Sequence, residues 1–227
     1  MHPQAAAILD TLHTVDAQRA LRARDPALAG RVQAVKHYQH ERFQRTYADL
    51  LGSPRYGAAA RFFLEDLYGP SDFSRRDTQF ARVVPALVRL FPKEVVHTVL
   101  TLGQLHALSE TLDTEMGQAV GPGPVDLAAY TAAWQAVGRP ADRERQIALM
   151  REVGDALDGY TRNPLLRRAL QLMRGPARLA GLSELQAFLE RGFDTFREMR
   201  GAKPFLDTVV ERERALAAEL FAAPVGR

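Results

Sequence analysis

The stretch "RFFLEDLYGPSDFSRRD", residues 61–77, places a sharp corner inside a chain of 227 residues. Two phenylalanines begin an apolar helical face, and a Gly-Pro pair starting at Gly69 is the expected order of residues at a helix C-terminus. Ser74 and Asp77 have the spacing of a capping box, which starts the next helix. The stretch therefore predicts two helices that meet at a turn, with charged residues gathered around it.

The remainder of the chain has the same helical periodicity. Apolar residues recur at spacings of three and four, and no segment alternates with period two. Proline and glycine divide the pattern into segments, so we expect an all-α multi-helix bundle of about nine or ten helices with no sheet. The expected helices cover about 4–24, 26–50, 62–67, 74–91, 92–118, 126–137, 141–160, 164–174, a segment beginning at Ser183, and 204–221.

The run "GPGP" at 121–124 is the strongest break between helices. Short connections on both sides favour a single all-helical domain over residues 1–227, with the second half packed on the first. A boundary at 121–124 is the alternative.

The composition is that of an ordinary globular protein, with 46% hydrophobic and 25% charged residues. Arginine supplies 27 of the 30 basic residues, a bias that indicates a GC-rich bacterial genome. The net charge is only +3 and acids are interleaved with the arginines, so we do not expect nucleic-acid binding. The acid-free stretch 161–178 has no aromatic residue for base stacking.

The N-terminal segment lacks the basic region of a signal peptide, and the charge-free run 95–109 is too short to span a bilayer. We therefore expect a cytoplasmic protein with no membrane contact. Cysteine is absent, which excludes disulfides and thiolate metal sites. A single Glu-x-x-His motif ends at His97, whereas a di-iron bundle needs two. His37, His40 and Glu41 lie on adjacent turns, but such pairs are more often solvated, so we expect no metal and no other cofactor.

The segment "LHALSETLD", residues 105–113, places His106, Glu110 and Asp113 on one helical face at i, i+4 and i+7. In one interpretation, which we favour, His106 pairs with Glu110 at the solvent edge. In the other, these residues form a histidine–acid pair at the mouth of a pocket and carry out acid–base catalysis.

The corner itself carries more arginine than its architecture requires. Arg75 and Arg76 lie in the first turn of a helix, where the macrodipole disfavours cations. They either join an internal network with nearby acids, which we favour, or hold an external anion at the helix N-terminus. The candidate residues of this corner are Glu65, Asp66, Tyr68, Asp72, Arg75, Arg76 and Asp77.

The residues of this corner also resemble the signature of the FFLEELY motif proteins, an uncharacterised bacterial family. In that signature a Phe-Phe-Leu-acid-acid-Leu-Tyr-Gly-Pro run precedes an Asp-Phe-Ser-x-Arg-Asp segment. Asp66 stands where the family name has glutamate. The resemblance implies no function.

The function is not fixed by these residues. We favour a helical binding or interaction module whose partner is a protein or a small anionic ligand. The alternatives are a helical enzyme that uses His106 with Glu110 or Asp113, and a haem- or metal-binding helical protein with His97 or His106 as the ligand.

Overall fold

The structure, a computed structural model, describes residues 2–67, 69 and 73–224. These residues form eleven α-helices and one π-helical turn, η1, and contain no strand, which confirms the all-α prediction. The elements are α1 (Pro3–Arg24), α2 (Pro26–Thr46), α3 (Ala48–Leu51), α4 (Gly57–Phe62), η1 (Phe63–Leu67), α5 (Ser74–Leu90), α6 (Lys93–Ala119), α7 (Leu127–Val137), α8 (Pro140–Thr161), α9 (Pro164–Leu179), α10 (Ser183–Glu198) and α11 (Lys203–Ala222).

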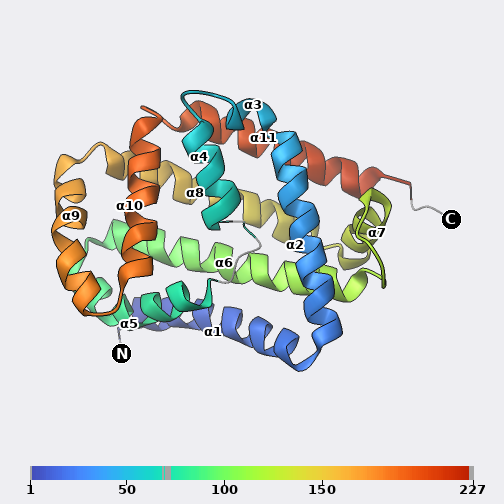
Figure 1. Ribbon diagram of the computed structural model, residues 1–227, viewed down its shortest axis with the longest axis horizontal. Helices are drawn as coiled ribbons and strands as arrows, with labels where there is room; N and C mark the ends of the chain where they lie inside the picture. The colour runs from blue at the N-terminus through green and yellow to red at the C-terminus, as the bar shows by residue number, and fades with distance from the viewer. Residues whose placement is uncertain (1, 68, 70–72, 225–227) are drawn as a thin grey trace.

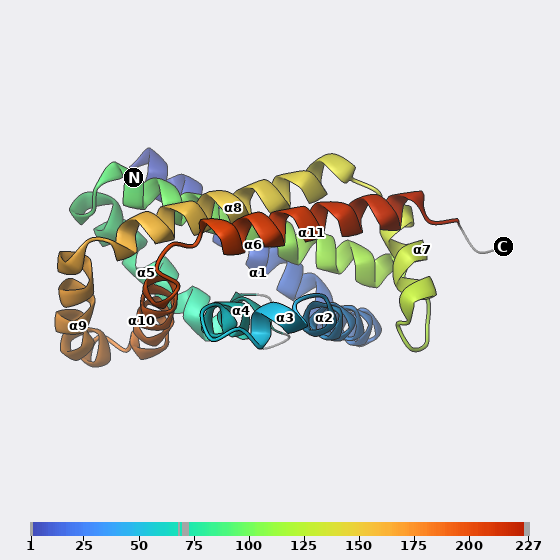
Figure 2. The same ribbon diagram turned by 90° about the horizontal axis from the view of Figure 1, so that it is seen from above.

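The helices form two crossing layers. Helices α1, α6, α8 and α11 run along the long axis of the molecule, whereas α2, α4 and α10 cross them (Figure 1). Seen from above, α2, α3 and α4 lie together in the second layer (Figure 2). Helix α6 packs against α1, α2, α5, α7 and α8 and so forms the centre of the fold.

Several helix starts follow from local side-chain chemistry. The Asp25 carboxylate accepts a hydrogen bond from the Leu28 N–H at 3.0 Å and caps α2. Asp126 caps α7 and Asn163 caps α9 in the same way. Each cap satisfies a backbone donor that the first helical turn leaves without a partner, so these starts agree with the sequence prediction.

The corner differs from its prediction in two respects. The third expected helix changes from α4 into the π-helical turn at Phe63. Ser74 is the first residue of α5 rather than its cap, because Phe73 occupies the N-cap position. Helix α5 runs through Pro85 to Leu90, which agrees with the expected range of 74–91. Residues 68 and 70–72, which include the candidates Tyr68 and Asp72, lie outside the described residues.

The largest core cluster joins the two halves of the chain. It includes Phe43, Phe63 and Leu105 from before the break at 121–124, and Met150 and Phe205 from after it. Helix α6 also packs directly on α8. That residues 1–227 form one domain stays a prediction, which this shared core supports.

Close helix packing fixes the position of α2 over α6. A Cβ atom on Gly117 of α6 would collide with the side chain and backbone of Val32 on α2. Only glycine lets the two backbones approach this closely. The contact brings the polar residues of α2 next to those of α6, where the candidate site lies.

Candidate functional site

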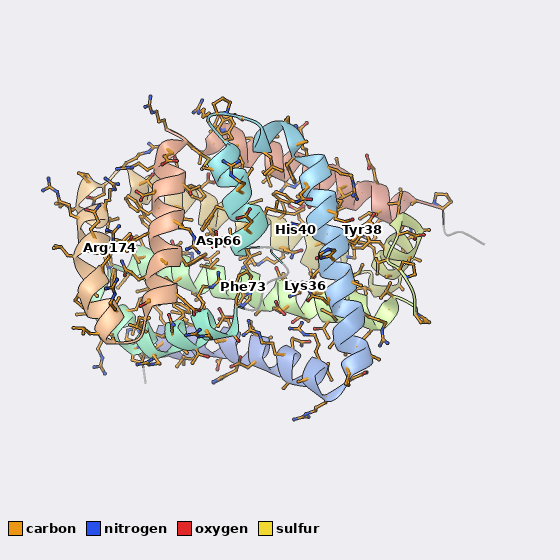
Figure 3. All side chains as sticks on the ribbon, viewed as in Figure 1. Lys36, Tyr38, His40, Asp66, Phe73 and Arg174 are labelled. Carbon is orange, nitrogen blue, oxygen red and sulfur yellow. The ribbon has the colours of Figure 1, made fainter. Side chains whose placement is uncertain are left out.

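A cavity of about 120 Å³ lies between the two layers, with walls from α2, η1, α6, α7, α8 and α11. Phe43, Ile147 and Val209 contribute apolar surface, and charged residues lie among them. Lys36 and His40 of α2 and Phe73, which precedes α5, are among the lining residues (Figure 3). A concave, mostly apolar site with a few polar groups is typical of small-molecule binding.

The "FFLEDL" part of the corner forms one side of this cavity. Phe63, Leu64 and Leu67 of η1 line it, together with Gly69. A π-helical turn inserts one extra residue into the helical repeat, and such turns occur often at functional sites. The sequence marked this stretch as a structural corner, and the structure shows that it also shapes an internal space.

His106, Glu110 and Asp113 all line the cavity. The pairing of His106 with Glu110 that we favoured from the sequence does not occur. His106 Nε2 lies 2.9 Å from Asp77 Oδ2, and Arg19 donates to the same oxygen at 2.6 Å. The interpretation that His106 pairs with Glu110 at the solvent edge is wrong, because Glu110 is only 6% exposed and has other partners. Tertiary packing of α1 and α5 on α6 thus joins the two candidate sites that the sequence analysis treated separately.

Glu110 is held by two cations. Lys36 Nζ lies 2.6 Å from its Oε1, and Arg22 Nη2 lies 2.5 Å from its Oε2. Burial disfavours the charged carboxylate, but the attraction and hydrogen bonds of Lys36 and Arg22 outweigh this cost and lower the pKa of Glu110 to about 2. Glu110 is therefore ionised and saturated, which does not suit a proton-transfer role.

Asp113 has weaker partners. Its Oδ1 accepts from Gln39 Nε2 at 3.2 Å, and Lys36 Nζ lies 3.7 Å from its Oδ2. Burial is the largest effect on this carboxyl group and raises its pKa above the usual value.

Sequence analysis missed Arg143, a buried arginine in the cavity wall. It is 4% exposed, and its guanidinium carbon lies 3.8 Å from the ring centroid of Trp134. Burial lowers its pKa. One signal was present in the sequence, because Arg143 lies four residues before Ile147 and seven before Met150, on the buried face of α8.

Several buried polar atoms of the residues that line the cavity lack a hydrogen-bond partner within the described part of the chain. They are His40 Nδ1, Arg42 Nε, Trp134 Nε1, Arg143 Nε and Arg143 Nη2. Buried polar groups in folded proteins are nearly always hydrogen-bonded, so a cluster of exceptions around one cavity needs a physical reason.

The corner arginines have internal partners, although not all of the predicted ones. Arg76 Nη1 donates to the Asp66 carbonyl oxygen at 2.8 Å, and its Nε lies 3.8 Å from Asp77 Oδ1. Arg75 pairs with Glu184 of α10 at 3.1 Å, a partner that its sequence neighbourhood did not indicate. The Asp66 carboxylate binds neither of these arginines.

Asp66 instead forms an ion pair with Arg191 of α10. Glu65 is exposed and makes no described contact with either corner arginine. The internal network at this corner therefore draws on α10 as well as on the residues close in sequence. Whether the corner arginines also bind an anion stays open to experiment.

His97 and the basic stretch of α9 both form ion pairs with neighbouring helices. His97 is exposed and pairs with Glu152 at 3.0 Å. No group of three or more potential metal ligands occurs among the residues that the structure describes. Two arginines of α9 pair with acids of α10, namely Arg167 with Asp194 and Arg174 with Glu190, and Arg174 lies at the edge of the molecule (Figure 3).

No helix within the described ranges is both long and apolar enough to cross a membrane. No curated protein and no solved structure matches the chain. The sequence model of one family, "Domain of unknown function (DUF8198)", matches residues 18–225. This match does not test the resemblance to the FFLEELY motif proteins, which stays a prediction. Because the match covers most of its length, the chain belongs to this family of unknown function.

Proposed function

We propose that this protein binds a small organic molecule in the cavity between its two helical layers. The observation that carries the proposal is the group of five unpartnered polar atoms on His40, Arg42, Trp134 and Arg143, all of them cavity-lining residues. A buried polar group without a hydrogen bond costs about 1–3 kcal/mol, and more if it is charged. A bound molecule that supplies the missing partners would remove this cost.

The size of the cavity supports the same proposal. Its volume of about 120 Å³ approaches that of an engineered apolar cavity of about 150 Å³ that takes up benzene. The expected ligand is therefore about the size of benzene, with on the order of six non-hydrogen atoms.

The direct test is to extract purified protein with an organic solvent and identify small molecules by mass spectrometry. We expect one compound in near-stoichiometric amount from the wild type. The control is Ile147→Trp, which fills the cavity and should carry none. Ser109→Phe, which narrows the same space from α6, serves if the first variant fails to fold. Absence of any compound from the wild type, with no stabilisation by any member of a small-molecule library, would refute the proposal.

A second candidate function is catalysis by His106, favoured by its contact with Asp77. Burial opposes ionisation of Asp77, but the hydrogen bonds of His106 and Arg19 outweigh it and lower its pKa. The ionised carboxylate of Asp77 accepts a hydrogen bond from His106 Nε2 and so fixes the orientation of the ring. This arrangement orients a histidine as a general base at a cavity.

A comparison of wild type with His106→Gln distinguishes binding from catalysis. Once the bound compound is identified, it is incubated with wild type and with His106→Gln. Conversion by the wild type alone, with equal binding to both proteins, would support catalysis. Retention of the compound unchanged by the wild type would leave binding as the function.

The compartment, the domain organisation and the absence of a nucleic-acid partner are proposed from the sequence. We propose a bacterial cytoplasmic protein that forms a single domain and acts without nucleic acid. The ion pairs of Arg167 and Arg174 with α10 support the last point, because paired arginines are less available to phosphates.

A further inference from the structure

We infer that the cavity ligand is a small monocarboxylate, with the carboxylate held by Arg143 and an apolar body lying against the aromatic and aliphatic wall. This inference rests on the proposed binding function and specifies its ligand class. It is carried by the identity of the unpartnered atoms, by the charges around the cavity and by the chemistry of its wall.

The two free atoms of Arg143 are Nε and Nη2. Their N–H bonds lie along one edge of the planar guanidinium and point the same way. This edge matches the two oxygens of a carboxylate, which accept side by side in a bidentate pair. The face of the same guanidinium stacks on Trp134 at 3.8 Å, which fixes the plane in which the carboxylate must lie.

The remaining unpartnered atoms are also donors. Trp134 Nε1 and Arg42 Nε carry hydrogens that cannot be removed near neutral pH. His40 Nε2 lies 3.3 Å from the amide nitrogen of Gln44, and in the tautomer in which Nε2 accepts from this amide, Nδ1 is a donor as well. The unpartnered buried atoms of Arg42, Trp134 and Arg143 are thus all N–H donors, and an ionised carboxylate is a group that only accepts hydrogen bonds.

The three cations of the cavity wall, Lys36, Arg42 and Arg143, differ in whether an acid pairs with them directly. Arg42 pairs with Glu213 at 2.5 Å, and Lys36 pairs with Glu110 at 2.6 Å. Arg143 forms no ion pair among the described residues. Asp113 and Glu115 act on the charge of Arg143 without pairing with it directly. A carboxylate would supply the direct partner at its free edge, and the nearby Asp113 makes a phosphate dianion a poorer fit than a ligand with a single negative charge.

The remainder of the wall suits an apolar body. Phe43, Phe63, Leu64, Ile147 and Met150 line the cavity. Benzoate combines one carboxylate with six apolar ring carbons and is at the upper limit of size for a cavity of about 120 Å³, whereas short aliphatic carboxylates lie below it. Benzoate is the first probe, and benzamide is its neutral control of nearly equal shape.

The experiment measures the melting temperature of ligand-stripped protein with each added compound, and the dissociation constant of each complex. The compounds are benzoate and benzamide, a series of aliphatic carboxylates with their amides, and inorganic phosphate. Ligands that bind only the folded state raise the melting temperature by mass action. We expect acids to stabilise the wild type, and their amides and phosphate to have little effect at matched ionic strength. Arg143→Lys keeps the positive charge but loses the two parallel N–H groups of the guanidinium, so the affinity for acids should fall at least tenfold. Arg143→Met removes the charge as well and should abolish acid binding.

The outcomes separate this inference from the proposed function. Equal binding of acids and amides that Ile147→Trp abolishes would overturn the carboxylate inference while the cavity remains a binding site. Stabilisation by phosphate alone, or acid binding that Arg143→Met leaves unchanged, would also overturn it. Failure of every compound, with no co-purified molecule in the wild type, would refute the binding function itself. Circular dichroism of each variant verifies that it has folded.

Discussion

Two arginines of this protein, the largely buried Arg76 at the corner and the buried Arg143 in the cavity wall, have similar surroundings but different hydrogen bonding. The Arg76 guanidinium carbon lies 4.2 and 4.3 Å from the ring centroids of Phe73 and Phe188, and Arg143 lies similarly over Trp134. Burial lowers the pKa of both arginines. Both regions therefore desolvate a cation against aromatic rings.

The difference lies in what satisfies each cation. Arg76 donates to a backbone carbonyl and lies near the Asp77 carboxylate, whereas Arg143 leaves Nε and Nη2 without partners in the described part of the chain. A buried charge costs stability unless hydrogen bonds or ion pairs, from the protein or from a ligand, compensate for its lost hydration. The comparison indicates an architectural role for the corner and a binding role for the cavity wall.

The largest effect is expected at Glu110, the most completely paired acid of the cavity. Glu110→Gln should lower the free energy of unfolding by about 3 kcal/mol at pH 7, since the folded-state pKa of about 2 lies well below the ordinary 4.5. A lowered pKa stabilises the fold above pH 4.5, and this contribution is lost as the pH falls toward 2. The difference between wild type and variant should therefore shrink over that range, as measured by denaturant unfolding. A difference independent of pH would contradict the assigned ion pairs.

An intermediate effect is expected at the corner. Arg76→Ala removes the donor to the Asp66 carbonyl and the contacts with two rings, and should cost roughly 1–3 kcal/mol, with no dependence on added phosphate. Arg75→Ala is the matched control, because its side chain is 81% exposed and its surface ion pair should contribute below about 1 kcal/mol. A phosphate-dependent rise in the wild-type melting temperature that Arg76→Ala abolishes would instead identify an anion site.

The smallest effect on stability is expected at Arg143. Without ligand, Arg143→Met should be about 0–1 kcal/mol more stable than wild type, because loss of an unpaired buried charge offsets loss of the contact with Trp134. Denaturant unfolding of ligand-free protein measures this difference. A loss of more than about 1 kcal/mol would show that Arg143 has a structural partner and would remove the contrast with Arg76.

The local part of the fold could be predicted from the sequence. Helix starts at Asp25 and Asp126 follow from side chains that reach backbone groups within three residues, and these were predicted within a few residues. The interruption at Tyr47 and the π-helical turn at Phe63 were not predicted. Neither has a proline or glycine signal, since both depend on packing against other helices.

The candidate site was predicted only in pieces. His106, Glu110 and Asp113 were recognised as one helical face, because spacing along a helix is a local property. Their partners were not, since Asp77 and Lys36 come from helices that approach α6 only after folding. Arg143 was missed because one arginine among 27 is not distinguished until its burial is known.

The sequence by itself determined the helical class, most helix boundaries and the charged corner, because periodicity, caps and breakers act over a few residues. Only the tertiary structure decided which charges are paired. Pairing depends on distances between residues such as Asp77 and His106, 29 positions apart, and on burial that strengthens or penalises each charge. The same burial leaves Arg143 without a hydrogen-bond partner at a cavity, a property that exists only once α7 and α8 have packed on α6.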